Sequence, residues 1–279
     1  MTVDMRPTSA ILAENKSISA ALDCHPFIDA ANDLLPSSHA GSFFIVSYVE
    51  DVEDGESRFT VLFHLMFLFQ ELGKPVVQLA ISAFNEKTKY YFSKEMNYVW
   101  LNKTSVAPQG LDITTPGGSL SGTIDSLCVK GQIVEGSKRF EMNLKMEPRG
   151  PVLPNLLTGV IPFSDGVDYE YALPRMETSG KMIVDGKPCN VTGWSWLDRE
   201  WGTLGPSKWT WMNIQLENDV QMSIWDEQTD NKKPDSHVGG KQRFATILSP
   251  NGDLIAAPVE IEELGSWQST RTNRTYANK

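Results

Sequence analysis

The sequence predicts an all-β protein made of two β-barrel or sandwich units in series, preceded by a short helical N-terminal arm. Two observations carry this prediction. From residue 42 onward, short runs of residues alternate apolar and polar with the period of two that is typical of strands. Clusters of Gly, Pro and Asn separate these runs at the short intervals expected of barrels and sandwiches.

The arm spans residues 1–41 and is largely polar. Short helices are expected at 18–22 and 27–34, and Pro36 with the two serines after it ends the helical pattern. The start of the arm lacks the long apolar core of a signal peptide, so a cytoplasmic protein is expected.

The first unit is expected over residues 42–147. Its strands are predicted at 42–49, 58–69, 76–84, 89–92, 119–130, 131–134 and 139–146. The strand at 58–69 is apolar on both faces, which fits one face in a core and the other lining an interior. His64 lies on the second face, as a buried wall residue or, alternatively, as a substrate-binding group.

Residues 148–168 are rich in Pro and Gly and are interpreted as a crossover to a second β unit at 169–279. The strands of that unit are predicted at 169–173, 175–184, 189–201, 209–216, 220–225, 242–248 and 255–264. Turn pairs such as Asp185-Gly186 and Asn251-Gly252 favour hairpins between them.

Composition excludes several classes of function. A net charge of −10 with a pI near 4.9 argues against nucleic-acid partners and against anionic membrane surfaces. No apolar run is long enough to span a membrane. Three scattered cysteines and four scattered histidines fit neither a disulfide framework nor a metal site, and no nucleotide-binding motif is present. No cofactor is therefore expected.

The chemistry is expected on the strand at 193–201, where alternation puts Trp194, Trp196, Asp198 and Glu200 on one face. Two carboxyls at i and i+2 are about 7 Å apart. In an apolar interior, desolvation and mutual repulsion raise the pKa of at least one of them, which makes it a general acid. Indole faces nearby stabilise a developing carbocation.

A structural alternative remains for this face: the two carboxyls face solvent, or pair with Arg199 or Lys208, while the tryptophans form core. The next strand presents four further side chains on one face, which either orient a polar group of a substrate or serve the fold. These are Trp209, Trp211, Asn213 and Gln215.

Two stretches carry a resemblance to a known family: Tyr-Glu-Tyr-Ala-Leu-Pro-Arg-Met at 169–176 and Gly-Trp-Ser-Trp-Leu-Asp-Arg-Glu-Trp-Gly-Thr at 193–203. They resemble the carotenoid 1,2-hydratase-like, lipocalin-type family, which includes hydroxyneurosporene synthase and kievitone hydratase-like proteins and is related to fungal lipocalin-like Diels–Alderases. The resemblance implies that Asp198 protonates a C=C bond. Tyr169 and Tyr171 stand where the family has a His-x-Trp pair, so the imidazole is missing here.

The resemblance implies a cofactor-independent enzyme of natural-product biosynthesis, a lyase or isomerase. It would act on a C=C bond of a hydrophobic terpenoid, prenylated or polyketide molecule by hydration or acid-assisted cyclisation. The expected catalytic residues are Asp198, Glu200, Tyr169 and Tyr171. A pericyclase that uses shape and hydrogen bonds, and a carrier without turnover, are the alternatives. Family members carry further C-terminal strands, so the second barrel is expected to be incomplete or to be completed in a homo-oligomer.

Overall fold

The computed structural model describes residues 5–14, 40–68, 76–99, 111–163, 166–202, 207–229, 241–270 and 273–277. Its largest feature is a 12-stranded antiparallel sheet with the strand order β4-β3-β2-β1-β12-β11-β8-β7-β6-β5. The strands of the first half are β1 (Ala40–Asp51), β2 (Arg58–Leu68), β3 (Val76–Asn85) and β4 (Tyr91–Val99). Those of the second half are β5 (Leu111–Thr115), β6 (Gly118–Thr123), β7 (Ser126–Glu135) and β8 (Lys138–Pro148).

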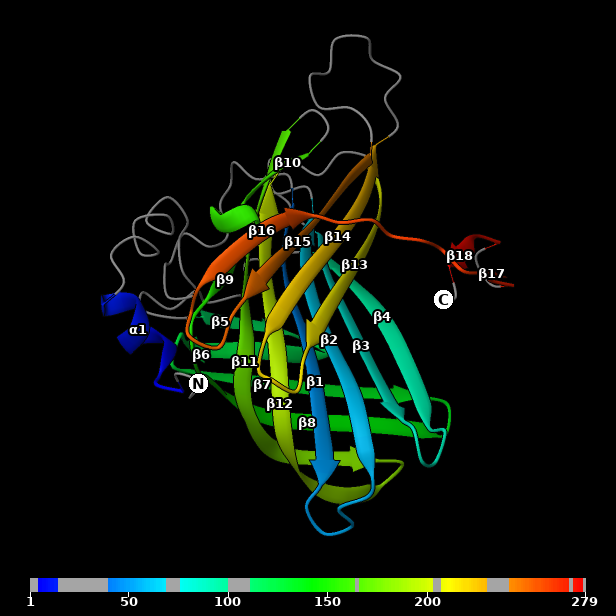
Figure 1. Ribbon diagram of the computed structural model, residues 1–279. Coiled ribbons are helices and arrows are strands. Elements are labelled where there is room, and N and C mark those ends of the chain that lie inside the picture. Colours follow the sequence, from blue (N-terminus) through cyan, green and yellow to red (C-terminus); the bar gives the residue numbers. More distant parts are fainter. Residues whose placement is uncertain are drawn as a thin grey trace.

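Two long strands, β11 (Gly166–Val184) and β12 (Lys187–Gly202), join the halves of this sheet. The short strands β9 (Leu153–Pro154) and β10 (Val160–Phe163) pair with β11, and a 3-10 turn, η2 (Asn155–Leu157), lies between them. Figure 1 shows β5 to β8 crossing behind β1 to β4, so the sheet folds back on itself. One helix, α1 (Thr8–Glu14), precedes it.

The inner face of the folded sheet holds the main core. On β2, the alternation seen in the sequence buries Phe59, Val61, Phe63 and the next two alternate residues to 7% exposure or less. The two halves touch: a Cβ on Gly131 of β7 would stand 2.6 Å from the Ile81 side chain of β3. The all-β prediction is confirmed, and the period of two is the reason that it could be made.

A four-stranded sheet packs on the outside of the large one (Figure 1). Its strands are β13 (Ser207–Gln215), β14 (Gln221–Thr229), β15 (Lys241–Leu248) and β16 (Leu254–Pro258), in sequence order. A separate hairpin of β17 (Ser266–Gln268) and β18 (Thr275–Ala277) follows. That a partner chain completes the small sheet stays a prediction.

The sequence places 169–201 in the second unit, whereas the hydrogen bonds place β11 and β12 in the large sheet. β12 pairs with β1 from Gly202 opposite Ala40 to Val191 opposite Asp51, and β11 pairs with β8. Local periodicity predicts a strand but not its partner, which is why the boundary at 148–168 does not separate two sheets. The segment 148–163 instead contributes β9, η2 and β10.

Smaller differences also have local causes. The sequence missed α1, which is short, and β5, which follows a segment without clear alternation. The helices expected at 18–22 and 27–34 lie outside the described residues. Within the described residues, the structure has no helix long and apolar enough to cross a membrane.

Candidate active site

Four carboxyl side chains meet on the outer face of the large sheet. On β12, Asp198 and Glu200 share this face because side chains alternate along a strand. On β11, Glu170 lies opposite Glu200, and Asp168 lies opposite Gly202. Opposed residues of antiparallel strands point to the same side, so the four carboxyls form one group. We call these four residues the carboxyl cluster.

Burial is the main influence on this cluster. Asp198, Glu170 and Asp168 are 5%, 2% and 0% exposed. Desolvation raises the pKa of Asp198 well above its ordinary value, and the charge of Glu200 adds to the rise. Desolvation likewise raises the pKa of Glu170 and Asp168, with help from neighbouring carboxyl charges. Burial thus favours the protonated form of the Asp198 carboxyl.

One hydrogen bond opposes this rise. The Trp196 indole Nε1 donates to Asp198 Oδ1 at 2.6 Å, and this bond lowers the pKa of Asp198 against the effect of burial. Trp196 is fully buried. A donor aimed at the carboxyl favours its ionised form, so Asp198 has a partner ready for the moment it gives up its proton.

Trp211 of the small sheet packs beside Trp196 and Asp198. Trp211 of β13 meets Trp196 edge-on, with ring centroids 6.2 Å apart, and meets Phe44 of β1 at 5.4 Å. Phe44 lies opposite Asp198 in the register of β1 and β12. Asp198 therefore lies between two packed sheets, among indole and phenyl rings.

Two parts of the structural alternative, exposure of Asp198 to solvent and a pair with Arg199, are wrong in the described residues. Arg199 points to the other face, where its guanidinium lies over the rings of Phe43 and Trp201, 4.5 and 4.9 Å from their centroids. Asp198 is buried and does not face solvent. The side chain of Lys208 lies outside the described residues.

Tyr169 and Tyr171 were expected beside Asp198, and this placement is wrong. Tyr169 lies opposite Trp201 in the register and stacks on its ring at 5.6 Å, and Tyr171 meets the same ring edge-on at 6.1 Å. Both therefore lie on the inner face. The residues just before them, Asp168 and Glu170, take the expected place. The sequence Asp-Tyr-Glu-Tyr at 168–171 contains both an acidic pair and a tyrosine pair. Only the register with β12 decides which of the two pairs lies on the same face as Asp198.

His64 of β2 lies on the outer face, next to Phe44, with ring centroids 5.2 Å apart. Burial lowers its pKa to about 4, so the imidazole is neutral at neutral pH. It belongs to the wall around Phe44.

The predicted residues of β13 serve the contact between the sheets. Trp211 Nε1 donates to Ser223 Oγ at 3.2 Å, Asn213 accepts from the Tyr48 hydroxyl at 3.3 Å, and Gln215 donates to the Pro174 carbonyl at 3.2 Å. Trp209 is 53% exposed. The bonds of Asn213 and Gln215 join the small sheet to the large one, whereas the Trp211 bond lies within the small sheet.

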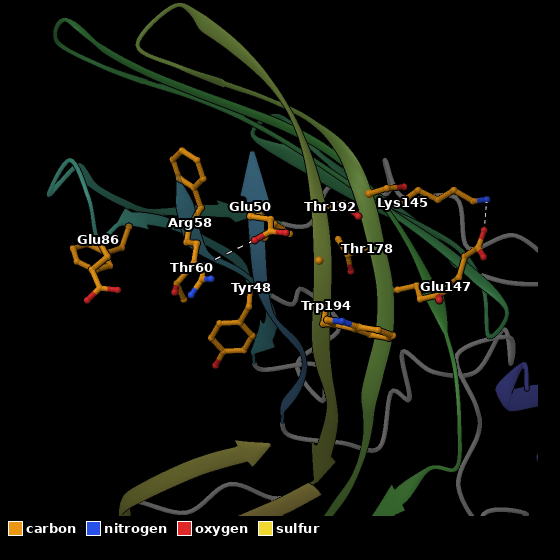
Figure 2. A pocket seen from close by; sticks show the side chains of 16 residues that line it. Tyr48, Glu50, Arg58, Thr60, Glu86, Lys145, Glu147, Thr178, Thr192 and Trp194 are labelled. Carbon is orange, nitrogen blue, oxygen red and sulfur yellow. Dashed lines mark hydrogen bonds and ion pairs between the residues drawn. The ribbon is translucent and has the colours of Figure 1, made fainter. Parts of the chain in front are cut away.

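A cavity of about 810 Å³ lies further along the same face (Figure 2). Three of its aromatic side chains are more than a third exposed, namely Tyr48, Phe84 and Trp194. Of the predicted site residues only Trp194 lines it. Trp194 is separated from Asp198 by four residues of β12, about 13 Å at the rise of a strand. Trp196 lies between them on the strand, so the cavity and the buried acid are neighbours on one face.

Comparisons with known proteins give one family match and further likenesses in sequence and fold. A family model described as AttH-like matches residues 72–279. The dehydratase asqC of Emericella nidulans is 29% identical over 126 residues, which are 42% of this chain and 35% of that protein. The matched part thus spans about a third of that relative.

Two solved structures share the fold. Kievitone hydratase from Nectria haematococca has a TM-score of 0.70 at 19% identity, covering 90% of this chain and 75% of that one. A Nitrosomonas europaea protein described as an AttH has a TM-score of 0.70 at 15% identity, covering 86% and 75%. These likenesses support a lipocalin-like β fold, and the resemblance drawn from the sequence is confirmed at the level of the family.

Proposed function

The chain belongs to the AttH-like family, and we propose that it is a hydratase-type lyase of secondary metabolism that adds water to a C=C bond or removes water to form one. The observation that carries this proposal is the buried Asp198 carboxyl, held by an indole N–H between two sheets. The printed names of the relatives, a dehydratase and a hydratase, support the same class of reaction.

In this proposal Asp198 is the general acid. In the direction of hydration, its proton moves to one carbon of the C=C bond, and a water molecule adds to the carbocation at the other carbon. In the direction of dehydration the step runs backwards: the hydroxyl takes a proton from a second acid or from water and leaves as water, and the Asp198 carboxylate takes the proton of the neighbouring C–H bond. In both directions the Trp196 N–H stabilises the carboxylate form of Asp198.

The aromatic rings around Asp198 have two roles in this step. The faces of Trp196 and Trp211 attract the developing cation, each by about 1–2 kcal/mol when water is excluded. The same rings keep bulk water away from the acid, which preserves its raised pKa. A carboxylic acid that is protonated near neutral pH is what protonation of an uncharged alkene requires.

The cavity is the proposed site for the apolar part of the substrate. Its volume of about 810 Å³ is within the range of small-molecule sites. Exposed rings of Trp194 and Tyr48 provide apolar contact. A substrate that reaches from this cavity to Asp198 has to be elongated, with its reactive bond at one end. Charged side chains also line the cavity, so the other end of the substrate can carry polar groups; they are Glu50, Arg58, Glu86, Lys145, Glu147 and Glu177.

Acid-assisted cyclisation is a second candidate, favoured by the dryness of Asp198. The proton transfer is the same, but a π bond of the substrate captures the cation instead of water. Labelled water separates the two outcomes, since only hydration introduces oxygen from solvent. A pericyclase would need no proton from Asp198 at all.

The test uses an aryl-substituted trisubstituted alkene and its tertiary alcohol as probes, in isotopically labelled water. Asp198→Asn keeps the shape and removes the acid, so turnover should fall by roughly 10²-fold or more. Asp125→Asn, on an exposed turn, is the matched control and should keep full activity. If Asp198→Asn keeps wild-type turnover, the proposed acid chemistry is wrong and a shape-driven reaction takes its place.

A further inference from the structure

One buried acid outside the carboxyl cluster has no part in the chemistry described so far. Glu227 of β14 is 1% exposed, and within the described residues neither of its carboxyl oxygens has a hydrogen-bond partner. Buried polar groups in proteins are almost always hydrogen-bonded, so such a residue requires an explanation. The indole N–H of Trp225, two residues earlier, is likewise without a partner.

The alternation of β14 shows which way Glu227 points. Glu227 and Trp225 share one face of the small sheet, and across the strand pair they lie opposite Trp209 and Trp211. Trp211 packs against Phe44 on the large sheet. Glu227 therefore projects into the space between the two sheets, toward the face that bears Asp198.

Two contacts locate Glu227 along that space. Asn213 of β13 accepts a hydrogen bond from Tyr48 of β1, and Trp211 of β13 packs against Phe44 of β1. Residues nearer the start of β13 therefore lie over residues nearer the start of β1, in the direction of Ser42. Ser42 Oγ donates to Glu200 Oε2 at 3.3 Å. The next position of the same face on β13 is Trp209, the partner of Glu227, so Glu227 lies beyond Trp211 in the direction of Ser42.

A second path through the structure leads to the same place. Ile161 of β10 lies opposite Asp168 in the register and shares its face. Ile161 belongs to a buried apolar cluster with Trp225 and Phe244 of the small sheet. Asp168 shares a face with Ile161 on the large sheet, and Glu227 shares a face with Trp225 on the small sheet, so both carboxyls lie beside this apolar cluster where the two sheets pack.

We propose that Glu227 is the second catalytic group, the base that works opposite the acid Asp198. This inference rests on the proposed function. In hydration, Asp198 gives its proton to one alkene carbon, while Glu227 takes a proton from the water whose oxygen bonds to the other carbon. In dehydration, Glu227 gives up that proton and Asp198 is reprotonated from the C–H bond that breaks. Each cycle moves one proton from one carboxyl to the other, and exchange with solvent restores both.

The surroundings suit this role. Burial raises the pKa of Glu227 to about 7, so both its forms are present near neutral pH. The titratable groups facing this space from the large sheet are the four carboxyls of the cluster, on β11 and β12, and His64 on β2. Arg243 of β15 points to the other face of the small sheet, where it binds Asp226 at 3.0 Å. In the described residues, no cation of the small sheet thus competes for Glu227.

The experiment compares Glu227→Gln with the control Glu217→Gln, which lies exposed on the turn after β13. The probes are the aryl-substituted alkene and its tertiary alcohol. Glu227→Gln should lower kcat by roughly 10²-fold or more with little change in KM. In wild type, kcat for hydration should rise with pH through about 7, as Glu227 ionises, and this rise should be absent from the variant. Glu217→Gln should match wild type.

A further variant keeps the test sharp if Glu227→Gln folds poorly. Glu227→Asp keeps a carboxyl one methylene further back and should retain the pH-dependent rise with a reduced kcat. The inference is overturned if kcat of Glu227→Gln still rises with pH through about 7, or if this variant changes only KM, while Asp198→Asn loses activity. If wild type turns over neither probe under any condition while binding both, the proposed function fails instead.

Discussion

One hydrogen bond opposes the effect of burial on the proposed acid. Burial raises the pKa of Asp198, and the Trp196 N–H, 2.6 Å from Asp198 Oδ1, lowers it. Hydrogen bonds to a charged group contribute about 1.5–3 kcal/mol. The bond acts mainly on the carboxylate, which is the state formed as the proton leaves.

Trp196→Phe tests this at the level of one residue. The phenyl ring keeps most of the apolar packing but has no donor, so the Asp198 carboxylate loses its partner. A loss of about 1.5–3 kcal/mol predicts a fall in kcat of roughly 10- to 100-fold. Trp267→Phe, on an exposed ring, is the control and should have no effect. Unchanged kcat in Trp196→Phe would mean that the bond is structural only.

At the same scale, the sequence identified part of the proposed site. The alternation of β12 was enough to place Asp198 and Trp196 together, and the structure agrees. Asp168 and Glu170 could not be chosen over Tyr169 and Tyr171, because a shift of one residue in register exchanges the faces of a strand. Glu227 could not be found at all, since only the packing of one sheet on the other makes it buried.

At the scale of elements, β12 connects the two halves of the proposed site. Trp194 lines the cavity, and Asp198 lies four residues along on the same face. The strand is held rigidly on both sides, by β1 and by β11. At Gly193 the neighbouring strand comes so close that a Cβ would stand 2.1 Å from the Tyr48 carbonyl oxygen. The pairing of β12 on both sides thus fixes the distance between Trp194 in the cavity and the proposed acid Asp198.

Trp194→Ala separates these two functions. It removes an exposed ring from the cavity and leaves Asp198 and its hydrogen bond in place. KM for the aryl-substituted probe should rise about 10-fold, a loss of about 1.4 kcal/mol, while kcat stays within a factor of about two. Trp267→Ala is the matched control. A fall in kcat with constant KM would place Trp194 at the reacting bond rather than in the binding cavity.

The sequence predicts the positions of several strands but not which strands pair. The strands around β2 follow clear alternation and were predicted within a few residues. The pairing of β12 with β1 joins residues about 150 positions apart, and no local pattern encodes it. The sequence therefore predicted strands at β11 and β12 but not the pairing of β12 with β1, which places both of them in the large sheet.

At the scale of the whole molecule, the buried acids should govern how stability depends on pH. The pKa of Glu227 rises from 4.5 to about 7 in the folded protein. Between these values the folded state binds more protons than the unfolded chain, so the contribution of Glu227 to the free energy of unfolding falls as pH rises. The contribution is complete below about 4.5. The raised pKa values of Asp168, Glu170 and Asp198 act in the same direction.

Chemical denaturation of wild type and Glu227→Gln across this pH window isolates the effect. The variant should gain stability relative to wild type as pH rises from about 4.5 to about 7. The comparison uses the difference in the free energy of unfolding between the two proteins. His64, whose pKa is lowered to about 4, contributes to the pH dependence of both with the opposite sign, and this contribution cancels in the difference. Glu217→Gln should track wild type. A constant difference at all pH values would show that burial does not perturb Glu227.

The most direct test of the central claim is the protonation state of Asp198 itself. Infrared spectra of the wild-type protein and of Asp198→Asn are compared in deuterated water at neutral pH, where a protonated carboxyl has a C=O band distinct from that of a carboxylate. The account predicts that the difference spectrum contains the band of a protonated carboxylic acid, lost in the variant. A difference spectrum with only carboxylate bands would contradict it, since Asp198 would then have no proton to give.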